Sequence, residues 1–353
     1  MKSVTIGKNQ AGQRLDKFLH KYLPLAGNGF LYKMLRRKNI TLNGKRAEGK
    51  EILALNDELR FFFSDETFAK FSGLPAAGSQ RNQGTIAAPA LHIQEYTNAC
   101  RSLGGISVLY EDEDCLIVNK PAGLLTQKAL PADISLNEWL VGYLLRQNQI
   151  SEEELGFFRP SVCNRLDRNT SGIVLCGKSL AGLQYLSKCV REHSVRKFYR
   201  TICVGALREP VTVSGYLVKD RDRNQVTVSG ESQSGASRER GSLIHTACLP
   251  ISVTPAFTLL EVELITGKSH QIRAHLASMG HPLIGDYKYG IASVNHDLKK
   301  RFGLDHHLLH ACRITFPEGT SGAGKPLSGR SICAPCPGAF QILEEALFPS
   351  APV

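Results

Sequence analysis

The segment 260–264 places the strongest constraint on the fold, because its side chains alternate strictly between apolar and acidic. Leu260, Val262 and Leu264 point to one side of an extended chain, and Glu261 and Glu263 point to the other. An alternation with a period of two predicts a β-strand with one buried and one solvent-exposed face. The fold that contains this strand is therefore expected to have a core on one side of a sheet and water on the other.

The strands and helices predicted around this segment follow no regular strand–helix alternation. Strand patterns occur at 107–110, 115–119, 172–176 and 198–204. One helix is predicted after Ser135, which can form a capping box with Glu138, and another after Ser179. The polar stretch from 229 to 242 is expected to be a mobile loop. The mixture predicts an α+β fold with a largely antiparallel sheet.

The first 66 residues form a smaller, basic unit with a pattern of its own. They hold 13 Lys and Arg against 7 Asp and Glu, a local net charge of +6 within a formal charge of +11 for the chain. Apolar side chains recur at i, i+3, i+4 and i+7 from Leu15 to Tyr22, which predicts a helix. A second short helix is expected to end at Arg36-Arg37-Lys38, Asn43-Gly44 predicts a hairpin turn, and 58–63 predicts a closing strand. Such an excess of cations favours a polyanionic partner, although a well-solvated basic surface is the alternative.

Residues 67–104 show no sustained periodicity and are predicted to be a linker between the unit 1–66 and a larger domain at 105–349. The chain has no run of about 18 apolar residues and begins without the apolar core of a secretion signal. Its ten cysteines are scattered through apolar segments, which predicts free thiols in a reducing compartment. Cys333 and Cys336 form a single pair without a second, so no zinc site is expected. We expect a cytoplasmic protein without a membrane span.

Two segments carry side chains suited to catalysis. In the first, Asp167 stands between Arg165 and Arg168, and neighbouring guanidinium groups favour the ionised form of a carboxyl group. An ionised carboxylate suits nucleophilic attack, but a plain salt bridge or a turn cap is the simpler explanation from local chemistry alone.

The second segment, 264–276, follows the alternating strand and predicts a turn and then a helix capped by Ser269. Lys268 and Arg273 lie at the first turn of that helix, which favours anions. Gly280 is placed to end the helix. The spacing of His270 and His275 does not put them on one helix face, so a metal pair is not expected.

Together these segments resemble the RluA-type family of RNA pseudouridine synthases. The family's signatures occur in order along the chain, as Asn119-Lys120-Pro121, the block 164–172, Lys197-Phe198-Tyr199, the block 266–273 and the turn 280–286. Leu309-His310-Ala311 fits a further element, so the resemblance spans about 106–347. Two positions depart from the family pattern. Asn164 stands where histidine is usual, and Lys268 where arginine is common.

The resemblance implies a role for each matching residue. Asp167 matches the catalytic aspartate, Tyr199 the tyrosine that stacks on the target base, and Arg273 the arginine paired with the aspartate. Arg165 matches the arginine that fills the gap left by the flipped nucleotide. Arg168, Lys268 and Ile272 are expected to help bind the substrate. The isomerisation involves no redox change, so the resemblance implies no cofactor and no metal.

The N-terminal unit resembles the alpha-L RNA-binding domain found in small-subunit ribosomal protein four and in many RNA-modifying enzymes. The resemblance covers about 11–66 and includes the segment from Lys38 to Lys45. Clustered cations on a rigid surface suit RNA phosphates. The RNA-binding residues expected here are Arg14, Lys33, Arg36, Arg37, Lys38, Lys45 and Arg46.

The expected function is therefore the isomerisation of specific uridines in structured RNA, with ribosomal RNA as the first expectation. Transfer RNA is an alternative substrate, and neither a membrane nor an obligate protein partner is expected. A catalytically idle RNA-binding protein is a second alternative, against which the presence of Asp167, Tyr199 and Arg273 argues. A glycoside hydrolase is a third, but most need two carboxylates, and Asp286, the only other candidate, reads as structural.

Overall fold

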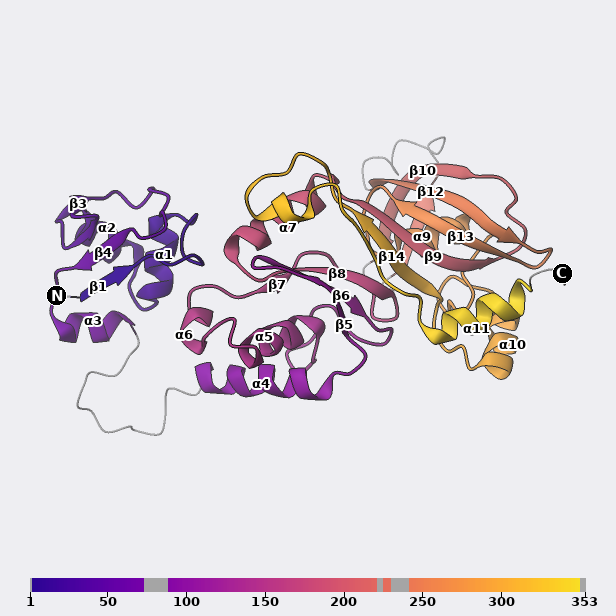
Figure 1. Ribbon diagram of the computed structural model, residues 1–353, viewed down its shortest axis with the longest axis horizontal. Coiled ribbons are helices and arrows are strands. Elements are labelled where there is room, and N and C mark those ends of the chain that lie inside the picture. The colour runs from indigo at the N-terminus through magenta and orange to yellow at the C-terminus, as the bar shows by residue number, and fades with distance from the viewer. Residues whose placement is uncertain (1, 73–87, 221–224, 230–240, 350–353) are drawn as a thin grey trace.

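The N-terminal unit forms the small α/β fold expected from its pattern. The computed structural model describes residues 2–72, 88–220, 225–229 and 241–349. Strands of the N-terminal sheet lie in the order β1-β4-β2-β3 in the described residues, and helices flank them (Figure 1). The elements are β1 (Lys2–Thr5), α1 (Leu15–Tyr22), α2 (Asn28–Arg36), β2 (Ile40–Leu42), β3 (Lys45–Arg46), β4 (Glu58–Phe61) and α3 (Asp65–Ser72).

Local sequence rules account for most of this unit. The apolar face of α1 is buried, as its spacing predicted, with Leu15, Phe18 and Leu19 inaccessible to solvent. The hairpin β2–β3 turns at Asn43 and Gly44, which have φ angles of 51° and 72°. Asparagine and glycine tolerate that left-handed conformation best, which explains why this pair forms the turn. The closing strand β4 ends two residues earlier than predicted.

The segment predicted as a linker contains helices at both ends. Helix α3 begins before it and reaches residue 72, and α4 (Ala88–Ser102) occupies much of its second half. Helix α4 lies beside α5 (Leu136–Arg146) (Figure 1). Tyr96 and Ala99 of α4 are buried there, so burial of one face explains a helix in a segment whose overall periodicity is weak.

The larger domain is an α+β fold built on one long mixed sheet, which confirms the predicted class. The strand order in the described residues is β11-β10-β12-β13-β9-β14-β8-β6-β5, with β15 beside β14 and β7 beside β8. Only the β14–β8 pair is parallel among them, so the sheet is largely antiparallel. The strands are β5 (Ser107–Glu111), β6 (Cys115–Lys120), β7 (Ser161–Val162), β8 (Ser171–Gly177), β9 (Arg196–Val204), β10 (Val211–Asp220), β11 (Gln225–Ser229), β12 (Ser242–Val253), β13 (Phe257–Leu264), β14 (Leu309–Thr315) and β15 (Ser331–Cys333).

Helices cover this sheet where the strands bury apolar side chains. Helix α5 begins with the predicted capping box of Ser135 and Glu138, and Ser179 caps α7 by accepting a hydrogen bond from the N–H of Gly182. The alternating segment 260–264 lies in β13, with its leucines and valine buried and its glutamates partly exposed. The remaining helices are α6 (Glu152–Leu155), α7 (Leu180–Arg191), α9 (Gln271–Ser278), α10 (Ala292–Phe302), the 3₁₀ helix η1 (Gly322–Leu327) and α11 (Gly338–Leu347).

The N-terminal unit contacts the larger domain through an aromatic cluster and two ion pairs. Phe157, which follows α6, stacks on Phe18 and Tyr22 of α1 with ring centroids 5.8 and 5.7 Å apart. The Lys8 ammonium lies 2.5 Å from a carboxylate oxygen of Glu113 and 3.1 Å from one of Asp114. These contacts fix how the basic unit faces the domain that carries the candidate site.

In the described part of the chain, no helix is long and apolar enough to cross a membrane. The described cysteines are all free thiols, as predicted. The predicted loop at 229–242 lies mostly outside the described residues.

Candidate active site

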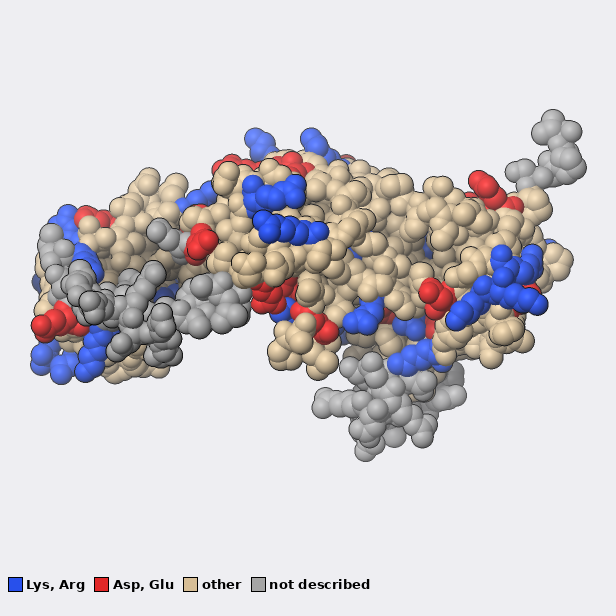
Figure 2. Space-filling model, turned by 90° about the horizontal axis from the view of Figure 1, so that it is seen from below, with Lys and Arg blue, Asp and Glu red and all other residues tan. Residues whose placement is uncertain are grey.

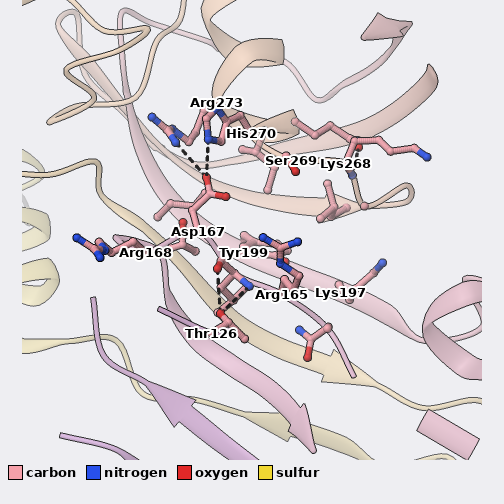
Figure 3. Close-up of a pocket in the computed structure, with 18 of the residues that line it drawn as sticks. Thr126, Arg165, Asp167, Arg168, Lys197, Tyr199, Lys268, Ser269, His270 and Arg273 are labelled. Carbon is pink, nitrogen blue, oxygen red and sulfur yellow. Dashed lines mark hydrogen bonds and ion pairs between the residues drawn. The ribbon is translucent and has the colours of Figure 1, made fainter. Parts of the chain in front are cut away.

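A cavity of about 640 Å³ lies where the loop before β8, strand β9 and the turn before α9 meet (Figure 3). Segments more than 100 residues apart in the sequence therefore line one space. The lining includes every residue that the sequence singled out as catalytic or substrate-binding, namely Arg165, Asp167, Arg168, Tyr199, Lys268, Ile272 and Arg273.

The loop that carries Asp167 is held by side chains around it. Thr126 donates from its hydroxyl to the carbonyl of Leu166 at 2.9 Å and accepts from the N–H of Leu166 at 3.1 Å. The ammonium group of Lys120, which is fully buried, donates to the carbonyls of Leu124 and Arg168 at 2.8 and 3.1 Å. Both side chains fix the backbone on either side of Asp167, so the position of its carboxylate is well defined.

Asn164 anchors the start of this loop to β8. Its amide donates to the carbonyl of Ile173 at 3.3 Å, and its side-chain oxygen accepts from the N–H of Leu175 at 2.7 Å. The side chain thus replaces a pair of backbone hydrogen bonds and extends the β7–β8 pairing. This position needs one donor and one acceptor, which an asparagine amide supplies.

Asp167 and Asp286 share the guanidinium group of Arg273. The Nη1 of Arg273 lies 3.0 Å from Oδ2 of Asp167, while its Nε and Nη2 donate to the two oxygens of Asp286 at 2.7 and 3.0 Å. The side chain of Asp286 is inaccessible to solvent, whereas that of Asp167 is 27% exposed. Asp286 therefore orients Arg273 from behind, and Asp167 faces the cavity.

The electrostatics of this group follow from burial and pairing. Burial opposes the charge of Arg273, but its hydrogen bonds and the charges of both aspartates outweigh that effect and raise its pKa. Burial also opposes the charge of Asp286 and by itself would raise its pKa. Hydrogen bonds from Arg273 and from two backbone N–H groups outweigh this effect and lower the pKa. The ion pair between Arg273 and Asp286 is thus stabilised in its charged form.

His270 is a second neighbour of Asp167. Its Nε2 lies 3.8 Å from Oδ2 of Asp167, and its Nδ1 lies 3.0 Å from the hydroxyl of Tyr289. His270 adopts a left-handed conformation with a φ of 57° and is the residue that precedes α9. The prediction that Ser269 caps this helix is therefore wrong, because the helix begins one residue later and no side chain caps it. Burial lowers the pKa of His270.

Tyr199 lies on β9, opposite Val262 of β13 and Ala311 of β14. Figure 3 places it on the far side of Asp167 from Arg273. Burial and, secondarily, the charge of Asp167 raise the pKa of its phenol, so the hydroxyl keeps its proton at neutral pH.

The other predicted substrate-binding residues surround this centre. Arg165, Arg168 and Lys268 are exposed, whereas Ile272 is buried. Arg168 and Lys268 lie on opposite sides of Asp167 (Figure 3). The cavity therefore has a polar, charged rim around a partly apolar floor.

The cations predicted to bind RNA in the N-terminal unit lie on its surface. Figure 2 shows lysines and arginines on the surface at that end of the molecule, as well as over its middle and its opposite end. Arg14 differs from the rest, because it makes a 2.6 Å ion pair with Asp16. The others are exposed and have no carboxylate within 4 Å among the described residues, namely Lys33, Arg36, Arg37, Lys38, Lys45 and Arg46.

Several residues of this centre were not predicted as site residues. Lys197 and His270 stood within the signature segments, but no role followed from local chemistry. Asp286 was expected to be structural, and only the fold reveals that its partner is Arg273. In the described residues, no group of three or more histidines, cysteines or acidic residues could hold a metal ion.

The comparison with known proteins agrees with this geometry. Residues 114–278, which include Asp167, Tyr199 and Arg273, match the family model described as RNA pseudouridylate synthase. This part of the chain is similar to the RNA pseudouridylate synthases that the model describes.

Similar proteins match over most of their length. Ribosomal large subunit pseudouridine synthase C is 27% identical over 325 residues both in Salmonella typhimurium and in Escherichia coli, covering 91% of this chain and 90% of each relative. An uncharacterised RNA pseudouridine synthase of Mycoplasma genitalium is 26% identical over 317 residues, covering 89% of this chain and 88% of that protein. The solved structure of human RNA pseudouridylate synthase domain containing 4 has the same fold, with a TM-score of 0.57 and 20% identity over 73% of this chain and 97% of that one.

Proposed function

We propose that this enzyme isomerises specific uridines of ribosomal RNA to pseudouridine, with Asp167, Tyr199 and Arg273 as its catalytic residues. One observation carries the proposal. A carboxylate that faces a cavity is held 3.0 Å from a guanidinium group, and a buried tyrosine lies on its other side (Figure 3). The names of the relatives support ribosomal RNA as the substrate, and such a substrate agrees with the expected cytoplasmic location.

The reaction moves one bond and one proton. The bond between ribose C1′ and uracil N1 breaks, the uracil turns, and a bond forms between C1′ and C5; the proton on C5 leaves and N1 gains one. Asp167 is the group that acts at the glycosidic bond, because its carboxylate lines the cavity and is held 3.0 Å from Arg273. Tyr199, which keeps its proton at neutral pH, supplies a ring for stacking and a hydroxyl near the reacting base.

The uridine must leave its stack to enter the cavity, which costs a few kcal/mol. Cations on the rim and on the N-terminal unit offset this cost by binding phosphates. Arg165, which is exposed and lines the cavity, would fill the space that the flipped nucleotide leaves.

Release of tritium from RNA labelled at C5 of uridine tests the proposal. Ribosomal and transfer RNA transcripts are incubated with the native enzyme, with Asp167→Asn and with a control, Asp297→Asn, whose carboxylate is 57% exposed on α10. We expect the native enzyme and the control to release tritium from ribosomal RNA and Asp167→Asn to release none. Substantial release by Asp167→Asn would refute the catalytic assignment, and release from transfer RNA alone would refute the substrate.

A further inference from the structure

Two lysines on one side of the cavity lack the acidic partners that neighbouring cations have. Lys197 is the second residue of β9, and Lys268 lies in the turn before α9. Both residues line the cavity. Neither ammonium group has a carboxylate within 4 Å among the residues that the structure describes. By contrast, Arg196, the residue before Lys197, pairs with Glu263 at 2.7 Å.

Lys197, which is partly buried, also differs from Lys120, the fully buried lysine of this region. The Lys120 ammonium donates to three backbone carbonyls, at 2.8 to 3.1 Å, and so has a structural role. The Lys197 ammonium makes no hydrogen bond to a described residue. Partial burial of this group lowers its pKa. A partly buried cation without a partner is unfavourable, so an anion that enters the cavity from solvent would stabilise it.

The two lysines lie at one corner of the cavity. A Cβ atom built on Gly267 would lie 3.6 Å from Nζ of Lys197 and would meet nothing else within 4 Å. Lys197 thus lies over the turn that carries Lys268, and the space above the turn is open. Gln271 fixes this turn by accepting from the N–H of Lys268 and donating to the carbonyl of His245.

This corner lies on a defined side of the catalytic centre. Figure 3 shows Lys197 and Lys268 together on one side of Asp167 and Arg168 on the other. Burial and, secondarily, the charges of Lys197 and Lys268 lower the pKa of His193. Both lysines therefore lie near this ring. A strand whose uridine occupies the cavity must continue past both sides.

We propose that Lys197 and Lys268 together bind one phosphodiester group of the RNA strand, next to the flipped uridine and on the side opposite Arg168. The inference rests on the proposed function, because it takes RNA as the substrate. Two ammonium groups without a carboxylate suit one phosphate, whose oxygens accept hydrogen bonds from both. The site would fix where the strand leaves the cavity and so contribute to the choice of uridine.

The salt dependence of RNA binding tests the proposal without turnover. Each variant is made in the Asp167→Asn protein, and its affinity for a large-subunit ribosomal RNA transcript is measured over a range of salt concentrations. The variants are Lys197→Met, Lys268→Met and both together, with Lys300→Met on α10, exposed and away from the cavity, as the matched control. Thermal unfolding confirms that each variant is folded.

The slope of log affinity against log salt falls by about 0.7 to 0.9 for each phosphate that the protein no longer neutralises. We expect a decrease of this size for the double variant, a smaller one for each single variant, and no change for Lys300→Met. A double variant with the slope of the control would overturn the proposal. A decrease of twice that size would mean two separate phosphates and would overturn the shared site.

A second experiment locates the phosphate. Once the tritium assay has identified a uridine, synthetic RNAs carry an uncharged methylphosphonate either before or after it. With the lysines present, one of the two is expected to lower kcat/KM by about tenfold, the effect of removing a charged hydrogen bond. The same substitution should have no effect on the double lysine variant. If the methylphosphonate lowered kcat/KM of the double lysine variant by the same factor as that of the native enzyme, the proposal would be contradicted. An enzyme that isomerises no uridine would contradict the proposed function alone.

Discussion

The two aspartates that share Arg273 are expected to respond differently to the same substitution. Replacing Asp286 by asparagine keeps the size of the side chain but removes its charge. One of its two oxygens becomes an NH₂ group that faces a donor of Arg273, so a hydrogen bond of 2.7 or 3.0 Å is lost. Arg273 is then left buried with Asp167 as its carboxylate partner among the described residues.

The magnitude follows from burial. Breaking an ion pair inside a protein by removing one partner costs about 3 to 5 kcal/mol, and the Asp286 side chain is inaccessible to solvent. With Oδ1 kept as the amide oxygen, the side chain still accepts from the backbone N–H groups of Lys288 and Tyr289, so we expect a decrease in stability of about 3 kcal/mol for Asp286→Asn. Asp167 is 27% exposed, and Asp286 still neutralises Arg273 in its absence. Asp167→Asn should therefore cost about 1 kcal/mol or less while abolishing turnover.

Urea unfolding followed by tryptophan fluorescence measures both effects. The chain has one tryptophan, Trp139, which is buried in α5 of the larger domain, so the signal reports on the domain that carries the site. Tritium release is measured in parallel. Equal losses of stability in Asp167→Asn and Asp286→Asn would refute the reasoning, as would an Asp286→Asn protein as stable and active as the native one.

Three further perturbations test other parts of the structure. Gly172→Ala should destabilise the protein by about 3 kcal/mol in the same unfolding assay, because Gly172 has a φ of 112° and an added Cβ would lie 2.3 Å from the carbonyl oxygen of Ala311; Gly267→Ala, whose Cβ would lie no closer than 3.6 Å to its neighbour, should not. Neutralising the cations at 36–38 should weaken RNA binding and flatten its salt dependence, and an unchanged slope would remove them from the binding surface. Burial lowers the pKa of His275 from 6.5 to about 4, so the unfolded chain binds more protons at this residue, and its contribution to stability should fall by about 2 kcal/mol from pH 7 to pH 5; His275→Gln should lose less stability than the native protein over that interval in urea unfolding.

The parts of the fold that depend on neighbouring residues could be predicted from the sequence. The helix at 15–22, the turn at Asn43-Gly44 and the capping box at Ser135 follow rules that involve positions within eight residues of one another. The buried strand at 172–176 and the half-exposed strand at 260–264 follow from hydropathy alone.

The rest depends on packing and pairing between distant segments. Helix α4 is stabilised by packing on α5, and the parallel pairing of β14 with β8 joins strands over 130 residues apart, so neither is visible in a local pattern. The Ser269 prediction failed for a related reason, since His270 adopts a left-handed conformation at that point and bonds to Tyr289.

The two departures from the family pattern turn out to have different physical meanings. Asn164 directs both polar atoms of its amide to the backbone of β8, so its effect is confined to the loop that carries Asp167. A neutral imidazole also offers one donor and one acceptor, so a histidine at this position would offer the same two kinds of hydrogen bond to the backbone of β8. Lys268, by contrast, is exposed at the cavity rim and shares its corner with Lys197. Lysine there gives a compact charge in place of a planar fork, so of the two departures it is Lys268 that the proposed phosphate site connects with the choice of RNA.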